Sequence, residues 1–586
     1  MKIKQRQIFQ QVFRKAEELG LSSLASRIVA GRVHDSAGLE KIIRPSLAYL
    51  HHPEGLKNCD WAADRLIRAI SSDERIGIIT DYDVDGITSH LVLLESFVFF
   101  QVDPERIDHF IGHRLEDGYG ISDNLTRRIL ENNELPGLII TADCGSSDEE
   151  NISRLQQAGI DVIVTDHHAI PESGVPLSAY GVINPVQQDC SYPDKTISGC
   201  MVSWLLMCLV RNRLIESGRL SPDISKLTFL LDFVALSTVA DAVSLASLAN
   251  RALINSGLQV MNTLARPCWR AVKRLSGKKR EPFSVDDLGF QIGPRINARS
   301  RMADPYGAFH FLSAENDHEA DRWLVVLEQD NQERKKIEQE MLKTARLQAE
   351  KVAGKKASIV VADDTFHAGV QGIVASRLVD LYGRPAVVLS PGRDPKQFSG
   401  SARTVDGIHV QQALQFVHTH DSGLMLSFGG HRGAAGMRIH RDRLGEFMEI
   451  FEQAVRIQAG ERKLGPVVMT DGGLDFSEIS LETLTEIESL VPFGREFENP
   501  AFEGVFAVER LRPVGADPIH LSLGLSIRGK IFQAIWFRAL ERAGDPLPFH
   551  KGDRVQCVYR LSENKFRGKT TLQLIVQYAT IQDDRL

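Results

Sequence analysis

The sequence predicts two α/β domains joined by a long helix, followed by a small β-barrel at the C-terminus. From about residue 70 to 260, short apolar runs alternate with helical stretches, which is typical of βαβ units in a mostly parallel sheet. Residues 317–353 contain no Pro or Gly and are rich in Glu, Gln, Lys, Arg and Leu, which predicts a helix of ~50 Å. A second α/β pattern follows, and from about Leu464 apolar and polar residues alternate as in antiparallel strands.

Length and composition indicate a multidomain protein of the reducing cytoplasm. A chain of 586 residues is too long for one core, and 43% hydrophobic with 25% charged residues is ordinary for a globular protein. Neither a membrane-length apolar run nor a signal peptide is evident. Seven cysteines without a CxxC pair argue against a disulfide framework or structural zinc. The net charge of −7 argues against indiscriminate coating of nucleic acid, although local basic patches remain compatible with it.

Changes in residue pattern divide the chain into five expected parts. Apolar residues at helical spacing, beginning with Ile8 and Val12, predict a helical N-terminal segment. Alternation at Leu521, Leu523 and Leu525 favours a barrel of the OB type, whose length suits the C-terminal region. The expected boundaries are 1–50 for an N-terminal helical support, 51–315 for the first α/β domain, 316–356 for the connecting helix, 357–460 for the second α/β domain and 461–586 for the OB-like domain.

Three carboxylates stand at the end of the first apolar run. Residues 76–80 read as a buried strand, and Asp81, Asp83 and Asp85 follow at spacings of two, before Gly86. In an open α/β sheet, ligands bind beyond the carboxyl ends of the strands. Three acids gathered there would repel each other unless a cation compensated them, and carboxylate oxygens suit Mg²⁺ or Mn²⁺. Taken alone, the same pattern would also fit a solvated acidic turn.

The same construction recurs, which favours the metal-site interpretation. The run 138–142 ends in Asp143, and the run 161–165 ends in Asp166, followed by His167 and His168. A long apolar segment, 229–240, precedes Asp241, which could close the site from a helix end or a loop. Several predicted strands that each finish in a potential ligand indicate one metal centre at the edge of the sheet.

Basic and glycine-rich segments offer candidate phosphate contacts. Arg114 and Tyr119 lie in a glycine-containing segment that pairs a guanidinium with a stacking surface, and an ordinary loop is the alternative. Arg295 follows a Gly-Pro pair in a basic region, whereas the basic run 278–280 is expected to be plain surface. Two glycine-rich loops are predicted in the second α/β domain, and they contain Ser401, Arg403 and His431. In the barrel, basic and aromatic residues could bind single strands. They are Arg528, Lys530, Phe532 and Trp536, and some of the aromatics must belong to the core.

Together these residues predict metal-assisted hydrolysis of a phosphodiester. Two divalent cations activate water and stabilise the charge that develops on the phosphoryl group. An imidazole that is not used as a ligand can contact the phosphate or assist proton transfer. The absence of a GxxxxGK[ST] sequence argues against an NTP-driven motor.

The ordered set of segments resembles the DHH phosphoesterase superfamily along nearly the whole chain. The segments 81–86, 143–145, 166–168 and 238–241 are similar to its four motifs, and 429–436 resembles the signature of the DHH-associated domain. The resemblance implies two Mn²⁺ or Mg²⁺ ions held by Asp83, Asp85, Asp143, His167 and Asp241. Asp81 would be a lesser ligand or lie just outside the ligand set. His168 would contact the scissile phosphate.

The resemblance also implies a substrate. Together with the OB-like region, it is strongest to the bacterial single-stranded-DNA-specific 5′→3′ exonucleases of DNA repair and recombination. Arg114, Ser401 and Arg403 would bind the 5′ phosphate, Tyr119 and Arg295 would hold terminal nucleotides in a narrow passage, and the barrel would hold the strand behind the active site. A cytoplasmic monomer with a helicase and a single-strand-binding protein as partners is implied by the family alone. The stretch 298–301 departs from the more glycine-containing family pattern, which leaves the roles of Arg299 and Arg301 open.

Two other functions remain to be distinguished. A small-substrate phosphodiesterase of the same superfamily would act on short oligonucleotides or cyclic dinucleotides, against which the extra barrel and the chain length argue. A non-catalytic replication scaffold of the superfamily would lack metal ligands, whereas every metal position is present here.

Overall fold

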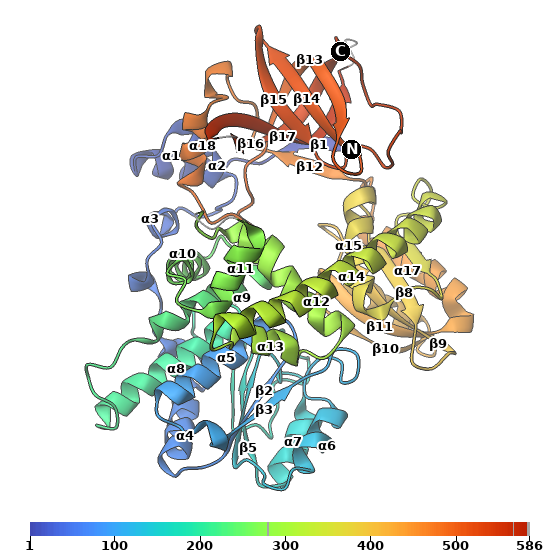
Figure 1. Ribbon diagram of the computed structural model, residues 1–586. Coiled ribbons are helices and arrows are strands. Elements are labelled where there is room, and N and C mark those ends of the chain that lie inside the picture. The colour runs from blue at the N-terminus through green and yellow to red at the C-terminus, as the bar shows by residue number, and fades with distance from the viewer. Residues whose placement is uncertain (278–280, 567, 583–586) are drawn as a thin grey trace. The chain divides into compact units, whose positions relative to one another are not determined.

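A computed structural model of the protein describes residues 1–277, 281–566 and 568–582 (Figure 1). The chain divides into two compact units, one formed by Pro45–Leu464 and the other by Met1–Arg44 together with Gly465–Leu586. The basic run 278–280 lies outside the described residues. All seven cysteines are free. Among the helices of the described ranges, none has both the length and the apolar character required to cross a membrane.

The first sheet of the larger unit is parallel throughout, as predicted. Its strand order is β3-β2-β4-β5-β6. The strands are β2 Ile76–Thr80, β3 Ile107–Ile111, β4 Leu138–Ala142, β5 Asp161–Thr165 and β6 Gly181–Ile183. Nearly every residue of β2, β4 and β5 is buried, which explains why they read as continuous apolar runs rather than alternating ones.

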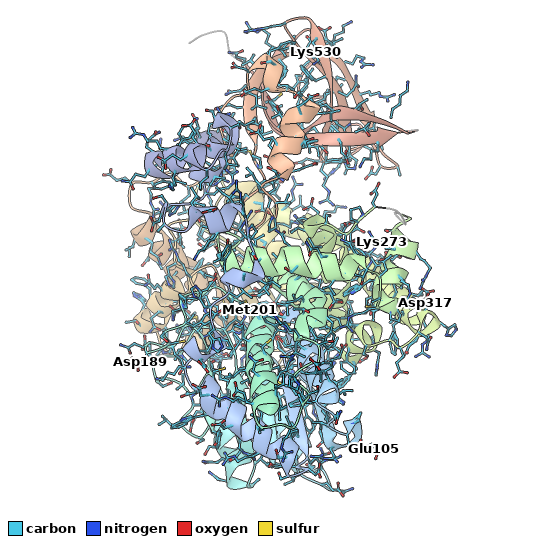
Figure 2. The ribbon with its side chains drawn as sticks, turned by 90° about the vertical axis from the view of Figure 1, so that its left-hand side faces the viewer. Glu105, Asp189, Met201, Lys273, Asp317 and Lys530 are labelled. Atoms are coloured by element: carbon cyan, nitrogen blue, oxygen red, sulfur yellow. The ribbon has the colours of Figure 1, made fainter. Side chains whose placement is uncertain are left out.

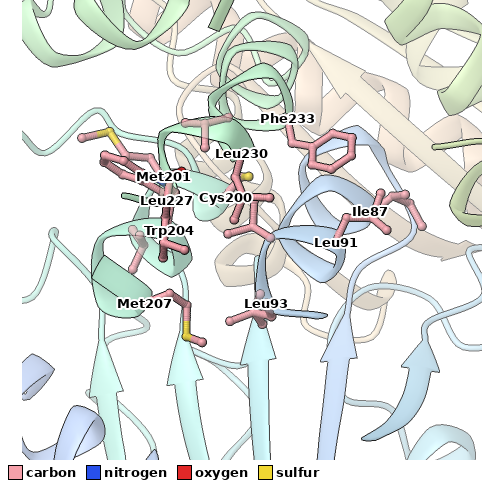
Figure 3. Packing of buried hydrophobic residues seen from close by; sticks show 14 of the residues in the cluster. Ile87, Leu91, Leu93, Cys200, Met201, Trp204, Met207, Leu227, Leu230 and Phe233 are labelled. Atoms are coloured by element: carbon pink, nitrogen blue, oxygen red, sulfur yellow. The ribbon is translucent and has the colours of Figure 1, made fainter. Parts of the chain in front are cut away.

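Helices cover both faces of this sheet. Ile139 and Val162 point into a core with α6 Asp123–Leu130 and α7 Glu149–Gln157. Ile78 and Ile140 point into the larger core on the opposite face, which contains α4 Cys59–Ser71, α5 Val84–Phe99, α8 Gly199–Glu216 and α9 Leu231–Ala240. Figure 3 shows residues of α5, α8 and α9 packed together above the ends of the strands. This packing brings the first turns of α5 and α8 and the end of α9 to one edge of the sheet.

A helical layer leads from this domain to the long helix. It consists of α10 Leu248–Asn262, α11 Pro267–Ser276, the π-helix Asp287–Ile292, α12 Gly293–Met302 and α13 Tyr306–Leu312. The predicted long helix is α14, Asp317–Glu350, and its 34 residues span about 50 Å at 1.5 Å per residue. Asp317 at its start, labelled in Figure 2, forms ion pairs with Arg270 and Arg274 of α11. Met341, Ala345 and Ala349 of α14 are buried in the core of the next domain.

The second α/β domain is a mixed five-stranded sheet of order β10-β11-β9-β8-β7. The strands are β7 Ile359–Ala362, β8 Ala386–Pro391, β9 Gln397–Arg403, β10 Met425–Gly430 and β11 Ala434–His440, and the helices are α15 Gln371–Tyr382, α16 Val410–His420 and α17 Leu444–Ala459. The two glycine-rich segments predicted here as loops are largely strand, and within the second only residues 431–433 form a loop. One forms β9, and the other forms most of the β10–β11 hairpin. A Cβ on Gly400 would lie 2.5 Å from Cδ2 of Leu389, so this glycine lets neighbouring layers approach closely.

The smaller unit joins the two ends of the chain. Strand β1 Lys2–Gln5 pairs in parallel with β12 Val467–Thr470. The buried side chain of Arg32 donates to both carboxylate oxygens of Asp471, at 2.6 and 3.0 Å. Helices of this unit are α1 Gln10–Glu18, α2 Ser23–Ala30, α3 Leu39–Ile43 and α18 Leu481–Glu488. The expected N-terminal segment therefore lies, up to Arg44, in the same unit as the C-terminal region.

A closed five-stranded barrel forms the rest of this unit, which confirms the predicted OB-like architecture. Its order is β13-β14-β15-β17-β16, with β15 and β17 parallel (Figure 1). The strands are β13 Phe502–Val514, β14 His520–Ile527, β15 Lys530–Trp536, β16 Arg554–Phe566 and β17 Lys569–Ile581. The alternating residues Leu521, Leu523 and Leu525 are buried in the core. Phe532 is also buried, so it is one of the aromatics that belong to the core.

Candidate functional site

The carboxyl ends of β2, β4 and β5 place the predicted ligands at one edge of the sheet. Asp81 and Asp83 follow β2, Asp143 follows β4, and His167 follows β5 at an interval of one residue. Because parallel strands all end at the same edge, segments distant in sequence meet there. Asp241 is the C-cap of α9 and approaches from the helical layer, in agreement with the helix-end position considered for it.

The turn after β2 holds its carboxylates rigidly. Asp83 is the N-cap of α5, and its Oδ1 accepts from the backbone N–H groups of Asp85 and Gly86 at 2.9 and 3.2 Å. A Cβ on Gly86 would lie 2.2 Å from the carbonyl oxygen of Asp81, so this turn requires glycine. Asp85 is buried, and its carboxylate accepts from the first N–H groups of α8, those of Gly199 and Cys200, both at 2.8 Å. These contacts stabilise its charge.

Asp143 is held in an uncommon backbone conformation. Its φ is +61°, in the left-handed region that costs energy for a non-glycine residue. Gly199 lies directly against it, because a Cβ on Gly199 would be 2.9 Å from Cβ of Asp143. The first turn of α8 therefore fits closely against this aspartate. Strain of this kind often occurs at functional positions.

His167 is the centre of the cluster. Its Nε2 lies 3.2 Å from Oδ1 of Asp143, 3.6 Å from Oδ2 of Asp85 and 3.7 Å from Oδ2 of Asp241. Three overlapping groups have one potential ligand atom per residue within 4.8 Å of one another. They are Asp85 with His167 and Asp241, Asp143 with His167 and His168, and Asp81 with Asp83 and Asp143. Since Asp143 and His167 each belong to two groups, the cluster can hold more than one cation.

The electrostatics of the cluster fit divalent cations. Burial raises the pKa of Asp143 well above its usual range, and the charges of Asp85, Asp83 and Asp241 raise it further. Burial likewise raises the pKa of Asp241 to about 7, although His167 opposes the shift. Oδ1 of Asp143 and Nε2 of His167 are buried without a hydrogen-bond partner among the described residues. Buried carboxylates that repel one another, beside an unpartnered imidazole nitrogen, are the arrangement that a divalent cation stabilises.

Asp166, which the sequence groups with the potential ligands, is used to position His168. Its carboxylate accepts from the backbone N–H groups of Ser146, His167 and His168, and its Oδ1 lies 2.8 Å from Nδ1 of His168. Burial alone would raise the pKa of Asp166, but the contact with His168 holds it below its usual range. The same contact overcomes burial to raise the pKa of His168 to about 9. Tyr119 completes this arrangement, with its hydroxyl 2.8 Å from Nδ1 of His168.

A cavity of about 380 Å³ adjoins His168 and contains most of the predicted phosphate-binding residues. Its lining includes Tyr119, His168, Ser401, Arg403 and His431. Nη1 of Arg403 donates to Oγ of Ser401 at 2.9 Å. A Cβ on Gly372 would lie 2.6 Å from Nη2 of Arg403, so the first turn of α15 lies directly beside that guanidinium. The unpaired N–H groups of a first helical turn favour anions.

The other predicted arginines have different environments. Arg114 lies over the ring of Tyr82, 4.1 Å from its centroid, and its buried Nε has no hydrogen-bond partner in the described part of the chain. Nε of Arg295 donates to Glu328 of α14 at 2.6 Å, so its charge is already paired. Arg299, whose role the sequence left open, is paired with Asp304 and Asp330.

One site residue was not singled out by sequence. Asn297 accepts from the N–H of Val84 at 3.2 Å and thereby ties α12 to the turn that carries Asp83. A lone asparagine in a helix carries no signal that would identify it, because the contact joins residues 213 positions apart.

The barrel has a basic groove of its own. A cavity of about 620 Å³ is lined by residues of β13, β14 and β15 and of the segment 547–551. Its basic residues are Arg510, Arg512, His550 and Lys551. The sequence instead singles out Arg528, Lys530 and Trp536, of which Arg528 lies in the turn between β14 and β15 and Lys530 is the first residue of β15.

Comparison with known proteins identifies similar chains. Residues 75–237 match the DHH family N-terminal domain, 354–456 match the DHHA1 domain, and 470–578 match the RecJ OB domain. The chain is 32% identical over 563 residues to the single-stranded-DNA-specific exonuclease RecJ of Haemophilus influenzae, which covers 94% of each protein. It also resembles the crystal structure of RecJ from Thermus thermophilus in complex with Mn²⁺, with a TM-score of 0.79 at 24% identity. That match covers 99% of this chain and 79% of the other. The Mg²⁺ complex of the same Thermus protein gives a TM-score of 0.75 at 23% identity, over 99% of this chain and 78% of the other.

Proposed function

The chain belongs to the RecJ family of single-stranded-DNA-specific exonucleases, and from this premise we propose that it removes nucleotides from single-stranded DNA in the 5′→3′ direction. The observation that carries this proposal is the overlap of three Asp/His groups at one edge of the parallel sheet. We further propose a role in DNA repair and recombination, as for the family.

The proposed ligands of two divalent cations, Mn²⁺ or Mg²⁺, are the residues that converge on His167 and on Asp143. They are Asp83, Asp85, Asp143, His167 and Asp241. Bound cations supply Lewis-acid activation of the attacking water and neutralise the charge that develops on the phosphoryl group. Asp81, with an unpartnered buried Oδ1, is a further potential ligand beside Asp83 and Asp143.

His168 is the proposed contact to the scissile phosphate. Asp166 and Tyr119 occupy its Nδ1 side, which leaves Nε2 as the atom that can donate to the substrate. The hydrogen bond to Asp166 and its charge raise the pKa of His168 above its usual value, which favours the protonated imidazole. A protonated imidazole donates a charge-assisted hydrogen bond to a phosphate oxygen and stabilises the charge of the transition state.

The proposed polarity rests on a 5′-phosphate pocket formed by Arg114, Ser401 and Arg403. The support is the cavity beside His168, in which Ser401 and Arg403 meet the first turn of α15. His431 and Tyr119 line the same cavity and would contact the terminal nucleotide. Arg295, held by Glu328, would help to hold the strand.

We propose that the barrel binds a further stretch of the strand, with its basic groove as the contact surface. The proposed organisation is a helical segment 1–50, a DHH domain 51–315, a connecting helix 316–356, a DHH-associated domain 357–460 and an OB domain 461–586. A cytoplasmic monomer that works with a helicase and a single-strand-binding protein completes the proposal.

One assay tests this function. End-labelled single and double strands are incubated with Mn²⁺, Mg²⁺ or a chelator, and the products are resolved by length. We expect cation-dependent shortening of single strands from the 5′ end and loss of activity in Asp143→Ala and His168→Ala proteins. A Ser401→Ala protein should lose its preference for a 5′-phosphate over a 5′-hydroxyl end while it retains activity. Wild-type rates in Asp143→Ala, or cleavage confined to di- and trinucleotides, would exclude the proposal.

A further inference from the structure

The cavity beside His168 has two walls, which come from different domains of the larger unit. Tyr119 and His168 line it from the first α/β domain. Ser401 and Arg403 line it from the second. Burial lowers the pKa of Arg403, and the charge of Arg114 lowers it further, so these two guanidinium groups are close enough to repel each other. The shape of the cavity therefore depends on how the two domains are held together at this point.

One wall is carried by the pocket segment, residues 113–119, which lies between β3 and α6. It contains both Arg114 and Tyr119. The buried carboxylate of Asp117 accepts from Nη2 of Arg128 on α6 at 2.9 Å. This ion pair ties the pocket segment to its own domain, but it does not connect the segment to the second domain.

Arg393 makes that connection. It lies between β8 and β9, and its Nη2 donates to the carbonyl oxygen of Glu116 at 2.8 Å and to that of Leu115. One atom of the guanidinium thus holds two adjacent carbonyl groups of the pocket segment. The chain continues from Arg393 into β9, the strand that carries Ser401 and Arg403. The contact therefore joins the two walls of the cavity.

We propose that Arg393 is a positioning residue that holds the pocket segment against the second domain and thereby makes the protein select 5′-phosphorylated ends. This inference rests on the proposed exonuclease function. Arg114 and Tyr119 can act on the terminal nucleotide together with the second wall only while the segment is held in place. Asp166 contacts His168 independently of the segment, so cleavage of a bound strand should depend on Arg393 less than binding does.

The test compares Arg393→Ala with the control Arg462→Ala on strands that end in a 5′ phosphate or a 5′ hydroxyl. Both arginines are exposed. Nη2 of Arg462 also donates to two backbone carbonyl groups, those of Gly407 at 2.9 Å and Gln458 at 2.7 Å, but both acceptors lie in the second domain. Steady-state cleavage with Mn²⁺ gives kcat and KM for each end. Hydrogen–deuterium exchange measures the opening of the pocket segment.

For Arg393→Ala we expect KM on 5′-phosphorylated strands to rise about three- to ten-fold, the effect of roughly one hydrogen bond. Its kcat should change by less than about two-fold, because the lost interaction serves binding. On 5′-hydroxyl strands KM should stay the same, so the preference for a 5′ phosphate falls toward that of Ser401→Ala. The amides of the pocket segment should exchange faster. Arg462→Ala should match the wild type in every measurement.

Arg393→Lys separates the geometry of the contact from its charge. A lysine at this position keeps the positive charge but not the planar fork, so it should recover only part of the preference for a 5′ phosphate. Because the side chain of Arg393 is exposed, both variants should fold, which circular dichroism checks.

Three results would overturn the inference. Unchanged exchange in Arg393→Ala would show that Arg393 does not hold the pocket segment, and an equal rise of KM for both ends would show that it does not act on the 5′ phosphate. Loss of the preference in Ser401→Ala but not in Arg393→Ala would overturn the inference and leave the proposed function intact. A wild type that binds the phosphorylated strand without cleaving it would instead refute the exonuclease function. Dissociation constants for the two ends, measured in chelator by fluorescence anisotropy, would then decide the inference in place of KM.

Discussion

Replacement of Asp241 by Asn should stabilise the cation-free protein at pH 8 and remove its stabilisation by Mn²⁺. The ordinary pKa of this carboxyl is 3.8, and burial raises it to about 7 in the folded chain. Between these two values the folded state holds a proton that the unfolded state has released, so the free energy of unfolding falls as pH rises from about 4 to 7. At 1.36 kcal/mol for each pKa unit, the loss reaches about 4 kcal/mol above pH 7. Asn carries no charge and avoids this loss.

Calorimetry in chelator and in Mn²⁺, at pH 5 and pH 8, measures both effects. In chelator at pH 8 the Asp241→Asn protein should unfold at a higher temperature than the wild type, and at pH 5 the difference should fall to less than half, because only about 1.2 of the roughly 3.2 pKa units of stability have been lost by then. With Mn²⁺ at one hundred times its dissociation constant, the wild type should gain about 2.7 kcal/mol, and the variant should gain much less. Asp232→Asn is the matched control, because Asp232 lies on the same helix but is paired with Arg266 at 2.7 Å. This control should be destabilised in every condition. If Asp241→Asn behaved like Asp232→Asn in chelator and kept its response to Mn²⁺, the cation site would not include Asp241.

Two other substitutions test how the cluster is supported. Asp166→Asn should lower the rate of cleavage by roughly 10- to 100-fold, because His168 loses the carboxylate that orients it and favours its protonated form. The affinity for Mn²⁺, measured by calorimetry, should change less than the rate of cleavage. Gly199→Ala should weaken Mn²⁺ binding and cost about 1–3 kcal/mol of stability, because its Cβ would lie 2.9 Å from Cβ of Asp143. Gly445→Ala, where a Cβ meets nothing within 4 Å, is the control for the glycine change. Unchanged Mn²⁺ affinity in Gly199→Ala would show that the first turn of α8 does not constrain Asp143.

Local sequence determined the elements and the edge at which the cluster forms. The continuous apolar runs before Asp81, Asp143 and Asp166 predict buried parallel strands, and the carboxyl ends of such strands share one edge. The unbroken stretch 317–353 predicts α14 nearly to its ends, and alternation in the C-terminal region predicts the barrel. These features depend on residue periodicity, which is a local property.

Tertiary structure alone decided which of the similar side chains take which role. Asp85 and Asp166 look alike in sequence, and both accept from backbone N–H groups in the structure. They differ in the histidine that they face, because Asp166 holds Nδ1 of His168, whereas Oδ2 of Asp85 lies 3.6 Å from Nε2 of His167. Of the arginines on α12, Arg295 and Arg299 form ion pairs with Glu328 and Asp330 of α14. Arg301 of the same helix instead lines a cavity. The pairing of β1 with β12 joins segments more than 460 residues apart. Charge partners and strand partners are set by packing between distant segments, and no pattern within a short window of sequence specifies that packing.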